Sequence, residues 1–428
     1  MTSHSVTPAR RITGEITVPG DKSISHRSII LGSLARGTTV IRGLLRGEDN
    51  MATLAAFRRM GIVIHDDGET VTVEGKGLHG LSEPDDVIDC GNSGTSMRLL
   101  TGLLAAQPFF SVLTGDRYLR RRPMRRVVEP LTRMGGEIHG RDGGERAPLA
   151  IVGRPLSGIR HQSAVASAQV KSAILLSGLY ADGETTVLEP HRSRDHSERM
   201  LASFGADVTI HGDGVTIKPG RELSPADIVV PGDISSAAFF MVAATIVPHS
   251  SLLIRNVGVN PTRTGIIDIL TLMGGDVALL DHREVSGEPV ADILVKSSPL
   301  RGVEIGGELV PRAIDEFPVI AVAAACAEGE TTIRDAAELR VKESDRIAAI
   351  AGSLRASGID VEEHPDGMTV RGGALSATTT DSRGDHRIAM AMLVAGLVAR
   401  GETVVTDVDC INTSFPTFFD LLSRVVER

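Results

Sequence analysis

The chain has 428 residues, a length typical of two to three domains. It has 42% hydrophobic residues, three cysteines and a formal net charge of −9, which argues against a disulfide framework and against general nucleic-acid binding. The N-terminus lacks the apolar core of a signal peptide, and the longest apolar runs are too short to cross a membrane. We therefore expect a soluble cytoplasmic protein that attracts any anionic ligand through local clusters of charge.

A repeated pattern organises the sequence. Six times a polar segment leads into an apolar, helix-like stretch, and a short β-branched strand follows. Spacings of 73, 73, 67, 79 and 72 residues separate the starts of these strands, at Gly37, Phe110, Gly183, Ser250, Gly329 and Gly401. A second helix that ends at a glycine and further strands complete each period. The regular spacing predicts one β-α-β-α-β-β unit used six times.

The two ends of the chain suggest how the units are grouped. The N-terminal strand RITGEITVPG has no helix before it, and the last predicted helix, FPTFFDLLSRVVER, has no strand after it. We therefore expect the C-terminal unit to close with the N-terminal strand. This predicts an α/β protein with two lobes of three units each, in which residues 1–20 and 233–428 form one lobe and residues 21–232 form the other.

Polar residues collect at the starts of the apolar helices, where free N–H groups and the helix dipole favour anions. In KSISHR, Ser23 and Arg27 are four residues apart and share a helix face, Ser23 is the predicted N-cap, and Lys22 is expected just outside the helix. A capped surface helix with two solvated cations explains the same pattern. In GNSGTSMR, Gly94 lacks a side chain where a ligand could approach backbone amides, although a plain capped turn also fits.

Two further segments in the first half carry candidates. RYLRRRPMRR holds six arginines in ten residues, of which Arg122, fixed by the following proline, is the best candidate for an inward-pointing anion clamp. A solvated charge run is the alternative. Ser167 and Gln169 are polar residues at the start of another apolar helix. The string HRSRDHSERM opens a helix too, but its histidines lack the spacing of a metal site, which favours a capped helix there.

The second half carries a sharper pattern. Asp315 leads into a helix that is apolar nearly all round, where a carboxylate can be a cap or a base of raised pKa. Lys342, Glu343 and Arg346 are predicted at the start of one helix, a combination suited to holding an anion and moving a proton. A surface ladder of salt bridges is the alternative. Arg387 adjoins another apolar helix and needs an anionic partner.

The candidate cations fit a pair of small anions. Two ligands with one phosphate and one carboxylate each would total about −5 to −6 at neutral pH. Six cations, three from each predicted lobe, match that charge: Lys22, Arg27, Arg122, Lys342, Arg346 and Arg387.

Taken together, and in this order, the motifs PGDKSISHR, GNSGTSMR, RRRPM, SAQVKSA, SRDHSE, RVKESDR, GDHRIAMA and SFPTFF resemble the 5-enolpyruvylshikimate-3-phosphate (EPSP) synthase family over essentially the whole chain. The resemblance implies transfer of the enolpyruvyl group of phosphoenolpyruvate to the 5-hydroxyl of shikimate 3-phosphate, with release of phosphate, in the shikimate pathway to chorismate and aromatic amino acids. It implies a monomer with no metal or organic cofactor. The implied fold is an inside-out α/β barrel of two lobes, with the active site in the cleft between them.

The resemblance also implies roles for single residues. Lys22 matches a position that contacts both substrates, and Asp315 matches the acceptor of the 5-hydroxyl proton. Lys22 and Glu343 match the pair that protonates and deprotonates the methylene carbon. Positions for shikimate 3-phosphate are matched by Ser23, Arg27, Ser167, Ala168, Gln169 and Lys342. Positions for phosphoenolpyruvate are matched by Gly94, Arg122, Gln169, Arg346 and Arg387. Gly94 further implies sensitivity to glyphosate, which occupies the phosphoenolpyruvate site in the family.

Three departures mark this chain within the family. Ala168 stands where many members have a second serine, Thr413 where many have a lysine, and Glu338 where an asparagine is common. One rival is the UDP-N-acetylglucosamine enolpyruvyl transferase, but that enzyme uses a loop cysteine and the corresponding stretch LTGDRYLRRRPM has none. A non-catalytic anion-binding protein is the other, and the presence of Lys22, Asp315 and Glu343 together argues against it.

Overall fold

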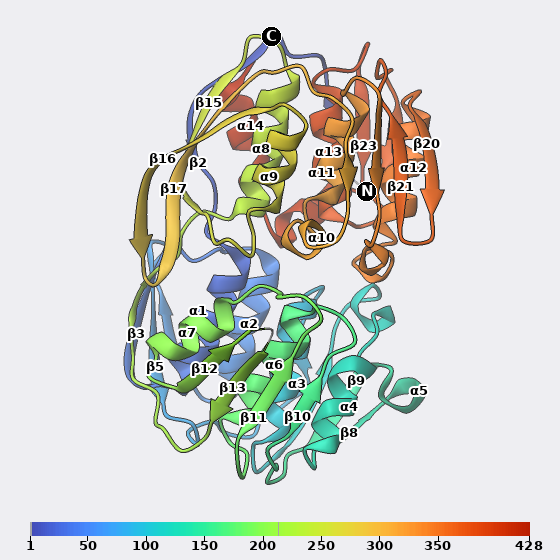
Figure 1. The fold of residues 1–428 in the computed structure, drawn as a ribbon. Coiled ribbons are helices and arrows are strands. Elements are labelled where there is room, and N and C mark those ends of the chain that lie inside the picture. Colours follow the sequence, from blue (N-terminus) through green and yellow to red (C-terminus); the bar gives the residue numbers. More distant parts are fainter. Residues whose placement is uncertain (1, 213) are drawn as a thin grey trace. The chain divides into compact units, whose positions relative to one another are not determined.

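The structure, a computed structural model, describes residues 2–212 and 214–428 (Figure 1). These residues form two compact units, each with its own hydrophobic core. Unit 1 contains the residues up to Pro19, then Pro231–Glu284 and Glu288–Arg428. Unit 2 contains Gly20–Val230 and Val285–Gly287. The described residues build six small sheets, three in each unit.

Unit 2 contains three repeats. In each, the strand that follows the first helix has one parallel neighbour, and antiparallel strands complete the sheet. The first repeat comprises α1 (Lys22–Leu34), β3 (Arg36–Arg42), α2 (Glu48–Arg59), β4 (Val63–Asp66), β5 (Thr70–Lys76) and β14 (Asp227–Val229). The second comprises β6 (Ile88–Asp89), α3 (Gly94–Ala105), β7 (Phe110–Thr114), η1 (Leu119–Arg121), α4 (Arg125–Arg133), β8 (Glu137–Gly140), α5 (Arg141–Gly144) and β9 (Arg146–Val152). The third comprises β10 (Arg160–Gln162), α6 (Ala168–Gly178), β11 (Thr185–Leu188), α7 (His196–Ser203), β12 (Asp207–His211) and β13 (Gly214–Lys218).

Unit 1 contains the other three repeats. The first comprises β2 (Arg11–Thr17), α8 (Ile234–Ile246), β15 (Ser251–Gly258), α9 (Gly265–Leu272), β16 (Asp276–Val285) and β17 (Glu288–Lys296). The second comprises β18 (Glu304–Ile305), α10 (Leu309–Arg312), α11 (Phe317–Ala325), β19 (Glu330–Ile333), η2 (Ala337–Val341), α12 (Arg346–Ala356), β20 (Asp360–His364) and β21 (Gly367–Arg371). The last comprises β22 (Thr379–Asp381), α13 (His386–Gly396), β23 (Thr403–Thr406), η3 (Val408–Thr413), α14 (Phe418–Val425), β24 (Val426–Glu427) and β1 (Ser3–Val6).

Strands are exchanged where the chain passes from one unit to the other. The sequence VPGD occurs at two of these passages, at residues 18–21 and 230–233. β2 precedes α1 along the chain but pairs in parallel with β15, while β14 precedes α8 but pairs in parallel with β3. The first strand of each affected repeat therefore comes from a distant part of the sequence.

This pairing corrects the predicted closure. The predicted strand RITGEITVPG does not complete the C-terminal repeat. That repeat is completed by β1, a segment that was not predicted as a strand and that pairs antiparallel with β23. The last helix is also shorter than predicted, because Val426 and Glu427 form β24 on the edge of β2. Periodic spacing reports how many units there are, but strand pairing depends on side-chain fit across the sheet, which the spacing does not contain.

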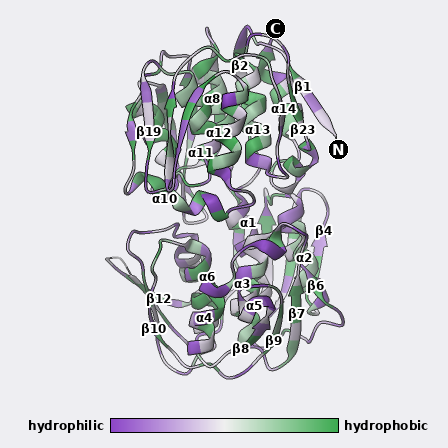
Figure 2. Cartoon of the chain, turned by 90° about the vertical axis from the view of Figure 1, so that its right-hand side faces the viewer, coloured by the Kyte–Doolittle hydropathy of each residue, from purple (hydrophilic) through white to green (hydrophobic). Residues whose placement is uncertain are grey.

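The central helices of unit 1 are buried on every side. Every residue of α11 and of α13 is buried, and so is all of α8 except its last residue. A helix that is apolar all round has no face to offer water, so it must lie inside. These helices lie between the sheet of β2, β15 and β17 and the sheet of β20 and β21 (Figure 1). Figure 2 shows the apolar residues along α8 and α13.

In unit 2, α3 and α6 touch backbone to backbone. A Cβ atom on Gly102 would lie 2.2 Å from the carbonyl oxygen of Ala173, and the Ser177 hydroxyl donates to the carbonyl of Gly102 at 2.7 Å. Only glycine permits so close an approach. The contact brings the N-terminal ends of the two helices, which carry Gly94 and Gln169, close to each other.

An aromatic cluster in unit 1 provides a test of the core. Phe418 is fully buried, and its ring lies 5.5–6.2 Å from those of four other phenylalanines. We expect Phe418→Ala to lower the free energy of unfolding by about 3–5 kcal/mol, the usual cost of deleting a buried ring. Phe110→Ala is the control, because Phe110 is 48% exposed. Chemical denaturation of both variants measures the difference, and equal small losses would contradict the packing described.

Candidate active site

The start of α1 places the first candidates. The Asp21 carboxylate accepts a hydrogen bond from the backbone N–H of Ile24 at 2.9 Å and is the N-cap. The prediction of Ser23 as N-cap is therefore wrong, and Lys22 is the first helical residue instead of standing outside the helix. Aspartate adds a favourable charge–dipole interaction to the cap, which serine lacks.

Lys22 is held by the neighbouring helix. Its Nζ lies 3.2 Å from Oδ2 of Asp49, in the first turn of α2, and the two side chains are 16% and 8% exposed. The Asn50 side-chain amide donates to the carbonyl of Lys22 at 3.1 Å. α2 therefore fixes both the backbone and the ammonium group of Lys22, and a partly buried cation of this kind can bind an anion at low ordering cost.

Arg27 is buried and is oriented by three contacts. Its guanidinium donates to the carbonyl of Ser23 at 2.9 Å, and to the hydroxyls of Ser172 and Ser197 at 2.7 Å each. The two hydroxyls are 2.6 Å apart. Each of these three partners is neutral, and together they set the direction of the guanidinium. Neither serine was among the predicted site residues.

The start of α3 is crowded by arginines. Ser93 caps the helix, and a Cβ atom on Gly94 would lie 2.7 Å from Nη1 of Arg122 and 2.9 Å from Nη1 of Arg98. Arg122 is 6% exposed and points inward, as Pro123 suggested. The missing side chain of Gly94 therefore makes room for the guanidinium of Arg122.

The start of α6 joins the same group. Arg98 donates to the side-chain carbonyl of Gln169 and to the carbonyl of Pro123 (3.2 Å), and the Gln169 amide donates to the Thr95 hydroxyl at 2.9 Å. Ser167 is the N-cap of α6, but its side chain makes no cap hydrogen bond. Ala168, the next residue, contributes no polar atom. Arg98 thus orients Gln169 and the loop of Arg122 together.

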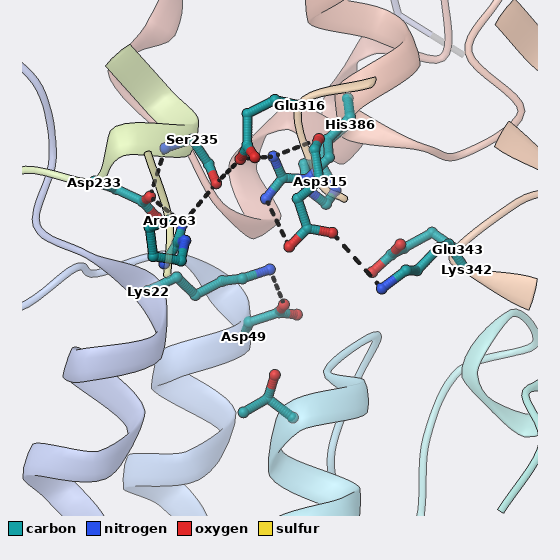
Figure 3. A network of polar contacts seen from close by, with 12 residues as sticks. Lys22, Asp49, Asp233, Ser235, Arg263, Asp315, Glu316, Lys342, Glu343 and His386 are labelled. Atoms are coloured by element: carbon teal, nitrogen blue, oxygen red, sulfur yellow. Dashed lines mark hydrogen bonds and ion pairs between the residues drawn. The ribbon is translucent and has the colours of Figure 1, made fainter. Parts of the chain in front are cut away.

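In unit 1, the Asp315 carboxylate faces three cations; Figure 3 shows this carboxylate beside Lys342. Oδ1 of Asp315 lies 3.2 Å from Nη1 of Arg346 and 3.8 Å from Nζ of Lys342, and Oδ2 lies 3.8 Å from Nη2 of Arg387. Arg387 also donates to the carbonyl of Asp315 at 3.0 Å. Because Asp315 is 16% exposed, its carboxylate can meet a ligand while its cations orient it.

Arg346 is the most deeply buried of these cations. It is 1% exposed, and it binds Asp385 at 2.9 Å and Glu343 at 2.6 Å in addition to Asp315. Burial opposes its charge, but the carboxylates outweigh burial and raise the pKa of Arg346. Burial likewise opposes the charge of Asp385, yet Arg346 prevails and lowers the pKa of Asp385. Both groups are therefore charged at neutral pH.

Lys342 and Glu343 do not lie on the helix where they were predicted. α12 begins at Arg346, and Asp345 caps it by accepting from the N–H of Ala348 at 3.0 Å. Lys342 and Glu343 precede it in the short linker between η2 and α12. Burial lowers the pKa of Lys342 to about 8, although Asp315 acts in the opposite direction.

A second buried polar group adjoins this cluster and was not predicted. Arg263, 2% exposed, donates to Asp233 at 3.1 Å and to the Ser235 hydroxyl at 2.7 Å. That hydroxyl donates to Glu316, whose carboxylate lies 3.8 Å from Arg387 (Figure 3). The signal in the sequence is the repeated VPGD motif, whose second aspartate is Asp233.

The structure places the predicted residues in two groups. Unit 2 holds Lys22, Ser23, Arg27, Gly94, Arg122, Ser167, Ala168 and Gln169, and unit 1 holds Asp315, Lys342, Glu343, Arg346 and Arg387. Thr413 is buried in unit 1 with its hydroxyl 3.3 Å from Nδ1 of His386. The charged partners that sequence reasoning missed are Asp49, Arg98 and Asp385, of which Asp385 was noted only as part of the GDHR motif.

The cysteines of the chain are unsuited to catalysis. Burial raises the pKa of Cys90 strongly and those of Cys326 and Cys410 to about 12. A thiol must ionise to act as a nucleophile, and these stay protonated at neutral pH. Cysteine chemistry therefore receives no support from the site.

Comparisons with known proteins decide the family. The family model described as EPSP synthase (3-phosphoshikimate 1-carboxyvinyltransferase) matches residues 6–422. The chain belongs to the EPSP synthase family. Its relatives include the 3-phosphoshikimate 1-carboxyvinyltransferases of Geobacter metallireducens, 71% identical, and Geobacter sulfurreducens, 70% identical, each alignment covering 100% of both chains. The predicted enzyme class and its place in the shikimate pathway are confirmed.

Solved structures support the same assignment. The EPSP synthase of Acinetobacter baumannii is 47% identical with a TM-score of 0.88, over 99% of this chain and 98% of that one. The enolpyruvyl transferase NikO of Streptomyces tendae, 19% identical with a TM-score of 0.77 over 98% and 96% of the two chains, shares the fold. The predicted inside-out α/β barrel is confirmed.

Within residues 2–212 and 214–428, no helix combines the length and apolar character needed to cross a bilayer. Within the same residues, no group of three or more His, Cys, Asp and Glu side chains is arranged to hold a metal ion.

The lowered pKa of Lys342 makes a prediction about stability. Between about pH 8 and pH 10.5 the unfolded chain keeps a proton that the folded protein has lost, so stability rises with pH there. Relative to Lys342→Met, the wild type should gain up to about 1.4 kcal/mol of unfolding free energy per pH unit in this window. Urea denaturation at pH 7, 8, 9 and 10 measures the difference.

A second lysine serves as the control. The hydrogen bond that Lys218 donates to the Glu184 carboxylate raises the pKa of Lys218, so Lys218→Met should show no such gain between pH 8 and pH 10. A flat or falling difference between wild type and Lys342→Met would show that Lys342 has an ordinary pKa.

Proposed function

We propose that the chain transfers the enolpyruvyl group of phosphoenolpyruvate to the 5-hydroxyl of shikimate 3-phosphate and releases phosphate. The observation that carries the proposal is the Asp315 carboxylate among Lys342, Arg346 and Arg387. A carboxylate oriented by cations can accept a hydroxyl proton while the same cations hold phosphate and carboxylate groups.

The reaction is an addition followed by an elimination. Protonation of the methylene carbon makes C2 of phosphoenolpyruvate electrophilic, and the 5-hydroxyl adds to C2 as Asp315 takes its proton. Loss of phosphate and of a methyl proton then regenerates the double bond. Lys22 and Glu343 supply and remove the methylene proton, and the arginines stabilise the charge that develops on phosphate.

Both units contribute to substrate binding in this proposal. Shikimate 3-phosphate is assigned to Ser23, Arg27, Ser167, Gln169, Asp315 and Lys342, and its phosphate loses the contact that a serine at Ala168 would make. Phosphoenolpyruvate is assigned to Gly94, Arg122, Gln169, Arg346 and Arg387, with Lys22 touching both substrates. In this proposal the enzyme has two lobes. Residues 1–20 and 233–428 form one lobe, and residues 21–232 form the other. The enzyme acts as a cytoplasmic monomer.

A phosphate-release assay with both substrates tests the proposal. Release that requires shikimate 3-phosphate and phosphoenolpyruvate together supports it. Release with UDP-N-acetylglucosamine in place of shikimate 3-phosphate, or binding of both substrates without turnover, would replace it with one of the rivals.

Asp315→Ala tests the proton acceptor. Turnover should fall by about 100-fold or more, because a positioned general base contributes on that scale. Substrate binding should change only modestly, since Lys342, Arg346 and Arg387 remain. Steady-state kinetics and calorimetry separate the two effects, and near-normal turnover would remove Asp315 from the mechanism.

Gly94→Ala tests the phosphoenolpyruvate site. The wild type should be inhibited by glyphosate. The new methyl group would lie 2.7 Å from Nη1 of Arg122, so the guanidinium must shift. Overpacking of this kind costs about 1–3 kcal/mol, and glyphosate, which is longer than phosphoenolpyruvate, should lose more of its affinity. Inhibition constants and KM values for both forms measure the effect, and a resistant wild type or equal losses for both ligands would refute the steric account.

A further inference from the structure

A buried ionic triad lies beneath the α6 end of the candidate site in unit 2. Nζ of Lys171 lies 2.8 Å from Oε2 of Glu189 and 2.8 Å from Oε1 of Glu198, and the three side chains are only 3%, 3% and 4% exposed. Burying charges is costly even when they are paired, and an apolar trio of similar volume is often as stable. A role in placing the surrounding groups would explain why the charges are there.

Glu189 holds two separate segments. Its Oε1 accepts the backbone N–H of Ser167 at 3.0 Å, and its Oε2 accepts the N–H and the hydroxyl of Ser193 at 3.2 and 2.8 Å. Ser167 is the N-cap residue of α6, and Ser193 belongs to the string HRSRDHSERM. Because Glu189 accepts from the backbone N–H of Ser167, it fixes the backbone position from which the side chain of that residue extends.

The other two members adjoin the serines that orient Arg27. Lys171 precedes Ser172, Glu198 follows Ser197, and both hydroxyls accept from the Arg27 guanidinium at 2.7 Å. The bridge from Lys171 to Glu198 joins α6 to α7 at the level of these two serines. One ammonium group therefore fixes the separation of two helices whose side chains meet at Arg27.

We propose that Lys171, Glu189 and Glu198 are positioning residues that hold Ser167 and Arg27 in the geometry that binds the shikimate phosphate. The proposal rests on the proposed function, which assigns both residues to shikimate 3-phosphate. The proposal also gives a role to the string HRSRDHSERM after β11. The serines and the glutamate of this string bind the segment to α6 and to the residues around it. Outside the triad, Glu189 and Lys171 bind Ser167 and Ser193, and neither serine is assigned to phosphoenolpyruvate.

Glu189→Gln and Glu198→Gln test the proposal with little change of shape. Glu189→Gln should raise the Kd for shikimate 3-phosphate about tenfold, because the amide cannot accept from Ser193 and Lys171 as a carboxylate does. Glu198→Gln should raise it about threefold, since Glu198 acts only through Ser197. The KM for phosphoenolpyruvate at saturating shikimate 3-phosphate should change less than about twofold. Calorimetry and steady-state kinetics give these values.

Asp292→Asn is the matched control. Asp292 is a buried carboxylate of unit 1 that binds Arg255 at 2.6 Å and Arg283 at 3.0 Å. Its loss should lower the midpoint of thermal unfolding and leave the Kd for shikimate 3-phosphate unchanged. A merely structural triad would behave in the same way, so an unchanged Kd in folded Glu189→Gln, or equal weakening of both substrates, would overturn the proposal.

Two further measurements keep the test decisive. If Glu189→Gln does not fold, Ser193→Ala removes only the 2.8 Å hydrogen bond to Glu189 and should still raise the Kd about threefold; an unchanged Kd there would count against the proposal. The wild-type phosphate-release assay separates the two hypotheses. A wild type without activity refutes the proposed function, whereas an active wild type with insensitive triad variants refutes only the positioning role.

Discussion

A helix that is buried along its whole length can carry charged side chains only at its ends. α11 and α13 have no exposed residue, so charged groups on their chains must lie at their ends. The N-terminal ends carry free N–H groups and the positive end of the helix dipole, both of which attract anions. Asp315 and Arg387 occur just at such ends. The apolar core of unit 1 thus determines where its charged side chains can gather.

Charged side chains beside an apolar core need partners of opposite charge within the same cluster. In unit 1, Lys342, Arg346 and Arg387 face the carboxylates of Asp315, Glu316, Glu343 and Asp385. The site is therefore not a simple cradle of positive charge, as counting only the cations suggested. Buried carboxylates hold the cations in place, and a ligand anion competes with them. Such a balance gives orientation more than raw attraction.

The sequence was informative wherever local chemistry decides the structure. The repeat, the buried helices and the groups at their ends follow from apolar spacing and from the glycine stops, and these predictions hold. The details failed where two local solutions compete. Asp21 replaced Ser23 as the cap of α1, and Lys342 and Glu343 lie before α12 because Asp345 caps it later than expected. Partners from distant segments, such as Asp49 for Lys22 and Arg98 for Gln169, depend on tertiary packing that no local pattern contains.

The exchanged strands have a consequence for how the protein is made. Unit 2 is almost continuous in sequence, so it can fold on the ribosome once β14 has emerged. β2 is synthesised before β15, its parallel neighbour, which follows more than two hundred residues later in the chain. β2 therefore has to wait for β15 before the two strands can pair. At about 5–20 residues per second this wait lasts on the order of 10–50 s. The sheet is complete only when Val426 and Glu427, which follow all its other strands in the sequence, add β24 to its edge. During that interval the nascent N-terminal strand has an unpaired edge, and chaperone binding there would protect it from pairing with other chains.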